Sequence, residues 1–388
     1  MTGPTDQNGS GRLDAIVVGG GVIGLASAWR AAQAGLRVRV LERDAPGAGA
    51  SGVAAGMLAP VGEATFGEER LLAMGLASHA LWPEFAEELS AEAGLTGYAE
   101  FGALHVALDR DEAAELRRRF DLMRSLDLDA RWLRPSECRE LEPGLAPGVS
   151  AGVFAPHEAA VAPRRLVEAL RRACERAGVE VREGAEVVEA IRDGERLAGV
   201  TTADGERHRA PAVVVAAGAW SGALEWLPAE ARPPVRPVKG QIITLRGPAS
   251  EPVAERIVAS ERVYIVPRDD GRLIVGATVE ELGFDARVTA GGVHELLREG
   301  YRALPDIAEL ELEEVAVGFR PGTPDNLPVI GPGALEGLVW ATGHYRNGVL
   351  LTPVTAQAVA ALLTGGEPAP EVEIARPERF ASETEVVR

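Results

Sequence analysis

Apolar and polar residues follow two different spacings along the chain, and these spacings predict its strands and helices. An unbroken apolar run at 15–18 predicts a buried strand, and a helical pattern follows it as far as Ala34. Gly35 ends this helix, and a second apolar strand is predicted at 38–41. A strand, a helix and a strand in this order predict the start of a parallel sheet.

The same spacings predict the elements of the rest of the chain. Helices are predicted at 67–95, 111–126, 164–177, 292–304 and 352–363. Strands are predicted at 101–108, 179–181, 186–192, 213–217, 315–320 and 338–342, with a hairpin at 201–209. We expect the strands between 179 and 217 to rejoin the first parallel sheet.

Residues 225–320 show a different pattern. The segments 236–245, 263–266 and 273–278 alternate in polarity or are rich in strand-forming residues, around a DDG turn. This pattern predicts an antiparallel sheet with one helix, which forms a second domain that carries a substrate pocket. The fold class predicted is therefore α/β, with a parallel-sheet domain and a second, antiparallel-sheet α+β domain.

The first strand runs into a glycine motif, Gly19, Gly21 and Gly24 in the spacing G-x-G-x-x-G. In this motif the first glycine allows a tight turn, the second lets the backbone approach a pyrophosphate, and the third lets the helix pack closely. The helix N-terminus offers N–H groups to phosphates. Glu42 ends the second strand, where an acid can bind a ribose hydroxyl. Because all these parts occur in order, the sequence predicts a dinucleotide site rather than an ordinary glycine-rich turn.

Two further loops are candidates for ligand contact. Residues 43–60 are small and mostly apolar, which favours close approach of the backbone to a flat ligand over a flexible linker. Near the C-terminus, the polar loop 343–348 precedes a helix that begins at Thr352 and Pro353. A helix N-terminus after such a loop is a second site that favours negative charge.

Composition and charge exclude several classes of protein. The 388 residues suggest two to three domain-sized units. The formal net charge of −18 gives an acidic surface, which disfavours nucleic acid as a partner. The basic residues are arginines except for Lys239, and we attribute this to coding bias. Cys138, Cys174 and the scattered histidines lack the spacing of metal ligands, so no metal site is expected.

The N-terminal region does not indicate export or membrane insertion. The charge-free stretch 15–29 could pass for a signal peptide, but the acids Asp6 and Asp14 precede it and glycines fill it. It is also too short to span a bilayer. We therefore expect a cytoplasmic protein without membrane contact. Residues 1–12 are polar and glycine-rich and are predicted to be disordered.

Several segments together resemble the D-amino-acid oxidase family of FAD enzymes, and within it the glycine oxidase branch that serves thiamine synthesis. The matching segments are VVGGGVIGLASAW, ASGVAAGMLAP, PVKGQ, YIVP, GRLIVGAT, GFRPGTPDNLPVIG and ATGHYRNGVLLTPVTAQ. The last two are specific, whereas the first is shared with most two-dinucleotide flavoproteins. Branch members often carry Met after GAT, where this chain has Val279, which we expect to line a small pocket.

The resemblance implies a Rossmann-like FAD-binding domain built from separate pieces of the chain, with a substrate domain over the flavin. We assign 13–80, 150–225 and 320–388 to the FAD-binding domain, and 81–149 and 226–319 to the substrate-binding domain. It also implies FAD contacts beyond the glycine motif, at Val22, Ile23, Glu42, Arg43, Ala50, Ser51, Ala55, Gly56, Met57, Val187, Gly218, His344, Tyr345, Arg346, Asn347, Gly348, Val349 and Leu350.

For the substrate, the resemblance implies contacts from Tyr264, Arg320 and Arg346. A small amino acid offers its carboxylate as one strong handle, and the planar arginine fork suits it. The reaction implied is oxidation of glycine, sarcosine or small D-amino acids, by hydride transfer to flavin N5. O2 is reduced to H2O2, and the imine serves thiamine synthesis or hydrolyses to glyoxylate and ammonia. Non-covalent FAD and a homo-oligomer are expected.

Other interpretations stay open. A D-amino-acid dehydrogenase or a relative of sarcosine oxidase would have the same fold, although sarcosine oxidases attach flavin through a cysteine near the substrate strand, and neither Cys138 nor Cys174 lies in the tail. A flavin-binding subunit without catalysis would not need Arg320 and Tyr264. A nicotinamide dehydrogenase would normally have a contiguous cofactor domain.

Overall fold

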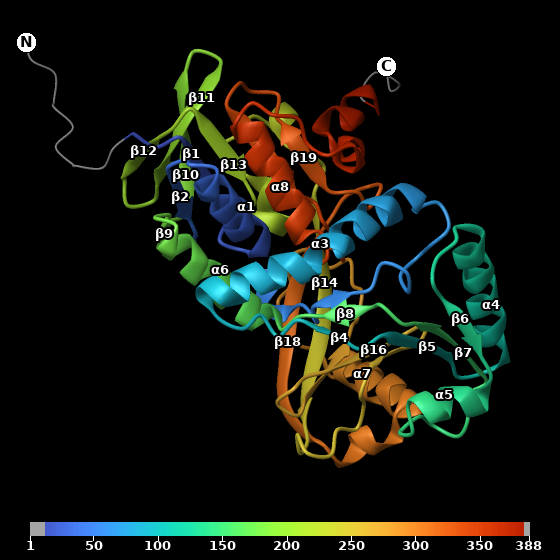
Figure 1. Ribbon diagram of the computed structural model, residues 1–388. Helices are drawn as coiled ribbons and strands as arrows, with labels where there is room; N and C mark the ends of the chain where they lie inside the picture. The colour runs from blue at the N-terminus through green and yellow to red at the C-terminus, as the bar shows by residue number, and fades with distance from the viewer. Residues whose placement is uncertain (1–11, 384–388) are drawn as a thin grey trace, which may run out of the picture.

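The computed structural model describes residues 12–383, which form two parts, each built around its own large sheet (Figure 1). The prediction of disorder at 1–12 falls outside the described residues, apart from Arg12. Both ends of the described chain lie at the part of the molecule that contains β1 and α8 (Figure 1). The predicted combination of a parallel-sheet domain and a mostly antiparallel second sheet is confirmed.

The first sheet has six strands, and the apolar runs of the sequence form its centre. Neighbouring strands are parallel, except that β19 and β20, the first two strands in the order below, are antiparallel. The order is β19 (Val329–Pro332), β20 (Leu338–Thr342), β13 (Ala212–Val215), β1 (Ala15–Val18), β2 (Val38–Leu41) and β9 (Glu180–Arg182). The central strands are buried on both faces, which explains their continuous rather than alternating apolar character.

Helices cover one face of this sheet, and a small antiparallel sheet covers the other. The helices are α1 (Val22–Gln33), α3 (Glu69–Ala93), α6 (Pro163–Arg176) and α8 (Thr352–Leu363). The small sheet consists of β10 (Val187–Asp193), β11 (Arg196–Thr202) and β12 (Arg207–Arg209). The prediction that the strands between 179 and 217 all rejoin the parallel sheet was therefore wrong for these three. They bury Leu197 and Val200 against the sheet face as a separate layer.

The second sheet has eight strands and is antiparallel except for the pair β15–β5. Helix α7 (Ala290–Ala303) packs on one face through Leu296 and Ala303. The helix α4 (Arg110–Ser125) covers β5 and β7, and α5 (Pro135–Leu141) lies nearby. The strand order is β18 (Glu311–Gly322), β14 (Arg236–Arg246), β17 (Arg272–Gly276), β16 (Tyr264–Pro267), β15 (Ile257–Ala259), β5 (Ala103–Ala107), β7 (Ala151–Ala155) and β6 (Arg131–Leu133).

Short elements connect the two parts. A three-stranded sheet has the order β3 (Met57–Leu58), β8 (Ala159–Ala160) and β4 (Ala99–Glu100), and the short helix α2 (Ala50–Val53) lies within the small-residue loop 43–60. Helix α3 continues through residue 80, and β18 runs through residue 320 within the second sheet, so two of the predicted domain boundaries lie inside elements. The domain bounds themselves stay a prediction.

The remaining described elements are short 3-10 helices. They are η1 (Gly218–Ala223), η2 (Ala229–Ala231), η3 (Pro305–Glu309), η4 (Pro370–Ala375) and η5 (Pro377–Glu383). Within residues 12–383, no helix is both long enough and apolar enough to cross a membrane.

Candidate cofactor and substrate site

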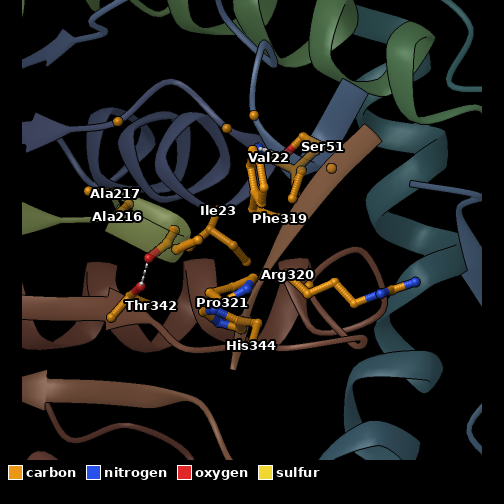
Figure 2. A pocket seen from close by; sticks show the side chains of 18 of the residues that line it. Val22, Ile23, Ser51, Ala216, Ala217, Phe319, Arg320, Pro321, Thr342 and His344 are labelled. Carbon is orange, nitrogen blue, oxygen red and sulfur yellow. Dashed lines mark hydrogen bonds between the residues drawn. The ribbon is translucent and has the colours of Figure 1, made fainter. Parts of the chain in front are cut away.

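A cavity of about 580 Å³ lies at the carboxyl ends of the parallel strands β1, β2, β13 and β20, against β14 and β18 of the second sheet. This is the edge of a parallel sheet where ligands bind in α/β folds. Its volume lies within the roughly 300–1,000 Å³ typical of small-molecule sites. Figure 2 shows Val22 and Ser51 on one side of the cavity and Pro321 and His344 on another.

The predicted site residues come together in this cavity, with the exceptions of Gly24 and Val279. Gly24 does not line it, but lies where a Cβ would be only 1.9 Å from the carbonyl oxygen of Gly19. The cavity-lining residues that the sequence predicted are Gly19, Gly21, Val22, Ile23, Glu42, Arg43, Ala50, Ser51, Ala55, Gly56, Met57, Val187, Gly218, Tyr264, Arg320, His344, Tyr345, Arg346, Asn347, Gly348, Val349 and Leu350.

The glycine motif makes a tight turn between β1 and α1. Gly19 has a φ of +112°, and a Cβ there would lie 2.4 Å from the carbonyl oxygen of Ala216, so only glycine is accommodated without strain. The side chain of Ser51 accepts a hydrogen bond from the N–H of Val22 at 3.1 Å. It thereby reaches the N-terminus of α1, and the loop 43–60 is folded back onto the glycine motif.

Glu42 connects the second strand to this turn. Its carboxylate accepts hydrogen bonds from the N–H of Gly20 at 2.6 Å and from the N–H of Asp44 at 2.9 Å, with one oxygen used for each. A carboxylate oxygen can accept more than one hydrogen bond, so both oxygens keep capacity for hydroxyl donors. Beside Glu42, the guanidinium of Arg43 lies 4.7 Å from the ring centroid of Trp220.

The C-terminal loop closes another wall of the cavity. The imidazole of His344 is buried and lies 3.0 Å from the hydroxyl of Thr355, and burial lowers its pKa to about 3, so the ring is neutral. The backbone N–H groups of Gly348, Val349 and Leu350 have no hydrogen-bond partner among residues 12–383. They precede the N-terminus of α8 and are available to a ligand.

Arg320 and Tyr264 come from the second sheet. Arg320 Nη1 donates to the carbonyl oxygens of Thr278 at 3.1 Å and of Lys239 at 3.4 Å, and the guanidinium lies directly over Gly240. A Cβ at Gly240 would lie 2.4 Å from Nη1, so this glycine makes room for the arginine. Burial raises the pKa of the Tyr264 hydroxyl, and this effect outweighs the nearby charge of Arg320, which acts to lower the pKa. Tyr264 therefore stays a protonated donor.

Arg346 and Glu63 place two more charges at the cavity. Arg346 is exposed, and its guanidinium lies 5.4 Å from the ring centroid of Tyr345. Glu63 is half-buried and was not predicted. Burial raises the pKa of Glu63, while Arg346 and Arg119 act in the opposite direction.

Sequence reasoning missed several lining residues and placed one wrongly. Glu63 is the first charged residue after the small-residue loop, Trp220 follows the end of β13, and Phe319 adjoins Arg320, so nearness to a predicted motif was the available signal. The expectation that Val279 lines the pocket was wrong, because its side chain is 61% exposed and outside the lining. It lies beyond the end of β17, where the chain leaves the sheet.

The donors and acceptors around the cavity fit an FAD-type dinucleotide. Glu42 would hold ribose hydroxyls, the glycine turn and the N-terminus of α1 would hold the diphosphate, and the N–H groups at 348–350 would bind the flavin ring. In the described part of the chain, no group of three or more His, Cys, Asp or Glu side chains could hold a metal ion.

Comparison with known proteins agrees with this geometry. The family model described as "FAD dependent oxidoreductase" matches residues 14–362. A glycine oxidase of Geobacillus kaustophilus is 38% identical over 92% of this chain and 94% of its own length. The bifunctional protein ThiO/ThiG of Trichormus variabilis is 38% identical over 89% of this chain but 52% of its own, so the chain spans about half the length of that relative.

A solved structure shows the same fold. The crystal structure of glycine oxidase from Geobacillus kaustophilus superposes with a TM-score of 0.87 at 36% identity, covering 95% of this chain and 99% of that one. The matched region contains both sheets and the cavity between them. The glycine turn and a cavity wall built from distant segments of the chain agree with these matches. The chain belongs to the family of FAD-dependent oxidoreductases, and within it is similar to glycine oxidases.

Proposed function

We propose that this protein oxidises glycine, and also sarcosine and small D-amino acids, to the corresponding imine. The substrate loses two electrons and two protons, and O2 takes them up to become H2O2. The observation that carries the proposal is the position of Arg320, whose fork reaches the cavity beside Tyr264. A bidentate, permanently charged donor is suited to a carboxylate.

In this proposal the residues of the chain mainly bind and orient the substrate. Arg320 holds the carboxylate, and the protonated hydroxyl of Tyr264 donates a second hydrogen bond to it. Ile242 and Phe319 provide apolar wall, which limits water around the Cα–H bond to be broken. FAD, when bound, supplies the electron-accepting chemistry. Orientation of this kind can contribute much of the rate enhancement.

We further propose that FAD is held without a covalent bond. Cys138 and Cys174 are fully buried and do not line the cavity. Burial raises the pKa of the Cys138 thiol to about 11 and that of Cys174 to about 12, so neither offers a reactive thiolate.

The place of the reaction in thiamine synthesis is also a proposal. It is supported by the similarity to the ThiO/ThiG protein, of which this chain matches about half. The imine would then be passed to thiazole formation, or would hydrolyse to glyoxylate and ammonia. An assembly of several copies of the chain remains a prediction.

A substrate panel tests the proposed activity. Peroxide release is measured with glycine, sarcosine, D-alanine and D-phenylalanine at matched concentrations. We expect turnover of the three small substrates and little with D-phenylalanine, because its side chain must fit beside the walls of a cavity that also holds the cofactor. Rapid oxidation of D-phenylalanine with no oxidation of glycine would contradict the proposal.

A further inference from the structure

Lys239 differs from the other basic residues in its type and in its burial. Among 40 lysine and arginine residues it is the one lysine, and its side chain is completely buried in β14. If coding bias alone decided the choice of basic residue, this position would carry arginine like the others. A guanidinium brings five N–H donors in a rigid fork, whereas an ammonium is compact and brings three. The burial therefore suggests that this position requires the smaller cation.

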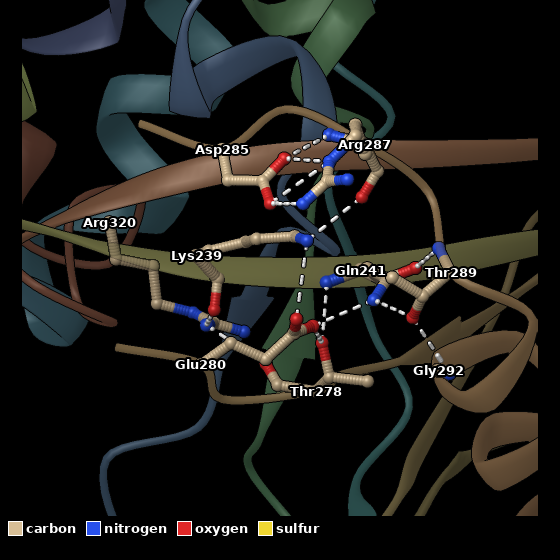
Figure 3. Close-up of polar contacts among 9 residues, drawn as sticks. All are labelled: Lys239, Gln241, Thr278, Glu280, Asp285, Arg287, Thr289, Gly292 and Arg320. Carbon is tan, nitrogen blue, oxygen red and sulfur yellow. Dashed lines mark hydrogen bonds and ion pairs between the residues drawn. The ribbon is translucent and has the colours of Figure 1, made fainter. Parts of the chain in front are cut away.

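The ammonium of Lys239 holds a strap, residues 277–289, against the edge of β14. Its Nζ donates to the carbonyl oxygen of Arg287 at 2.8 Å and pairs with Glu280 Oε2 at 3.2 Å (Figure 3). The backbones of Lys239 and Glu280 also exchange two hydrogen bonds, at 3.0 and 2.9 Å. The strap is thus attached both by its backbone and by an ion pair between the buried Lys239 and the half-buried Glu280.

Glu280 connects Lys239 to Thr278, because its carboxylate binds both side chains. Its Oε1 accepts from the Thr278 hydroxyl at 2.6 Å and from Gln241 Nε2 at 2.7 Å, and the Thr278 hydroxyl accepts from the N–H of Gln241 at 2.9 Å. Although burial acts in the opposite direction, the hydrogen bonds from Gln241, Thr278 and Lys239 together lower the pKa of Glu280. Glu280 is therefore the charged partner that Lys239 requires.

Thr278 and Lys239 both accept a hydrogen bond from Arg320. The two carbonyl oxygens lie 3.1 and 3.4 Å from Nη1, so they set the direction of the guanidinium (Figure 3). Lys239 itself does not line the cavity, because its side chain points to the face of the sheet opposite Gly240 and Ile242. The influence of its side chain on the cavity must pass through the strap.

We propose that Lys239 is a positioning residue for carboxylate recognition, acting through Glu280 and Thr278 to fix the direction of the Arg320 guanidinium. This inference rests on the proposed function, in which Arg320 binds the substrate carboxylate. A loss of Lys239 leaves the half-buried Glu280 without its cation and loosens the strap that supports Arg320. Carboxylate binding is weakened, while the chemical step on substrate already bound is affected less.

The test uses the FAD-loaded enzyme as wild type, Lys239→Met, Glu280→Gln and the double variant. We measure kcat and KM for glycine, and the affinity for acetate, a carboxylate without an amine, by its perturbation of flavin absorbance. In both single variants KM for glycine and the dissociation constant of acetate rise together, on the order of 10- to 100-fold, as expected for a misplaced binding group. The double variant is no worse than the more affected single variant, because the residues act in series.

A matched control separates positioning from general stability. Glu142 is a buried carboxylate away from the cavity, and it accepts from the N–H groups of Glu255 and Arg256. Glu142→Gln lowers the melting temperature but leaves KM and acetate affinity at wild-type values. If Lys239→Met does not fold, Glu280→Gln and Thr278→Val carry the test. Wild-type acetate affinity in the folded Lys239 or Glu280 variants, or additive effects in the double variant, would overturn the proposal.

Arg320→Leu distinguishes failure of this proposal from failure of the proposed function. If Arg320→Leu binds acetate as well as the wild type, the carboxylate site itself is wrong. If Arg320→Leu loses acetate binding while Lys239→Met and Glu280→Gln keep it, the positioning proposal alone is wrong. Acetic anhydride gives a second readout, because Lys239 is the one lysine. We expect slow acetylation in the native wild type and faster acetylation in Glu280→Gln; acetylation of the wild type as fast as its terminal amine would overturn the proposal.

Discussion

Glu158 has its carboxyl group enclosed by protein, one hydrogen bond away from the segment that carries Glu63. One oxygen accepts from the N–H of Gly62 at 2.7 Å, and the other has no partner among residues 12–383. Burial raises the pKa of Glu158 to about 8, although the hydrogen bond from Gly62 opposes this. The group is therefore a protonated acid at neutral pH, next to the segment that carries Glu63.

This raised pKa makes stability depend on pH in a defined direction. Below the ordinary carboxyl pKa of 4.5, both the folded and unfolded chains keep the proton. Between 4.5 and about 8 the unfolded chain releases it and the folded chain does not, so the free energy of unfolding falls with rising pH, by roughly 3–5 kcal/mol in total. We expect Glu158→Gln to remove this decline, as measured by urea unfolding between about pH 5 and pH 9.

The exposed Glu281 provides the control, since Glu281→Gln should follow the wild-type pH dependence. Parallel curves for wild type and Glu158→Gln across this range would contradict the assignment.

Single residues were predictable from the sequence where a motif fixes the backbone around them. The glycines, Glu42 and Arg320 all follow from such motifs, and the cavity contains them apart from Gly24. Glu63 and Val279 were not predictable in the same way. The direction of a side chain beyond a strand end depends on which distant segments pack beside it, and neither residue belongs to a motif that fixes that direction.

At the scale of elements, the turn between β1 and α1 determines how closely the first helix approaches the sheet. A Cβ at Gly24 would meet the carbonyl oxygen of Gly19 at 1.9 Å and the side chain of Val17 at 3.3 Å. Gly24→Ala must therefore shift α1 away from the turn that faces the cavity. We expect a loss of about 1–3 kcal/mol of stability, typical of overpacking, and a lower flavin content after purification.

Gly148→Ala is the matched control, because a Cβ there meets nothing within 4 Å. It should keep both the flavin content and the melting temperature of the wild type. Full flavin content in Gly24→Ala would show that the close packing of α1 is not needed for cofactor binding.

Most long helices and strands could be predicted because their apolar spacing is regular. The structure has α8 at 352–363 as predicted, and α3, α4, α6 and α7 differ from prediction by a few residues at their ends. The strands β10, β11 and β12 show the limit of this method. The spacing predicted β10 and a hairpin at 201–209, which covers β12 but only the end of β11. The choice of sheet depended on tertiary contacts with the face of β13 and β1.

At the scale of the whole molecule, the cavity exists because two sheets meet at one edge. Parallel strands bring the turns after β1, β2, β13 and β20 to that edge, and β14 and β18 bring Gly240 and Arg320 to its other side. The sequence predicted two domains with one site between them. It could not predict how the strap at 277–289 supports Arg320, because that support arises from hydrogen bonds between segments far apart in the chain.

The central claim is that the cavity recognises a small amino acid by its carboxylate through Arg320. The most direct test compares initial rates of peroxide release from glycine and from methylamine, which lacks the carboxylate, in the wild type and in Arg320→Leu. We predict that the wild type oxidises glycine and not methylamine. Arg320→Leu keeps bound FAD but raises KM for glycine, as expected from a loss of about 2–5 kcal/mol when one partner of a buried charge pair is removed. Oxidation of methylamine by the wild type as fast as glycine, or an unchanged KM in Arg320→Leu, would contradict the account.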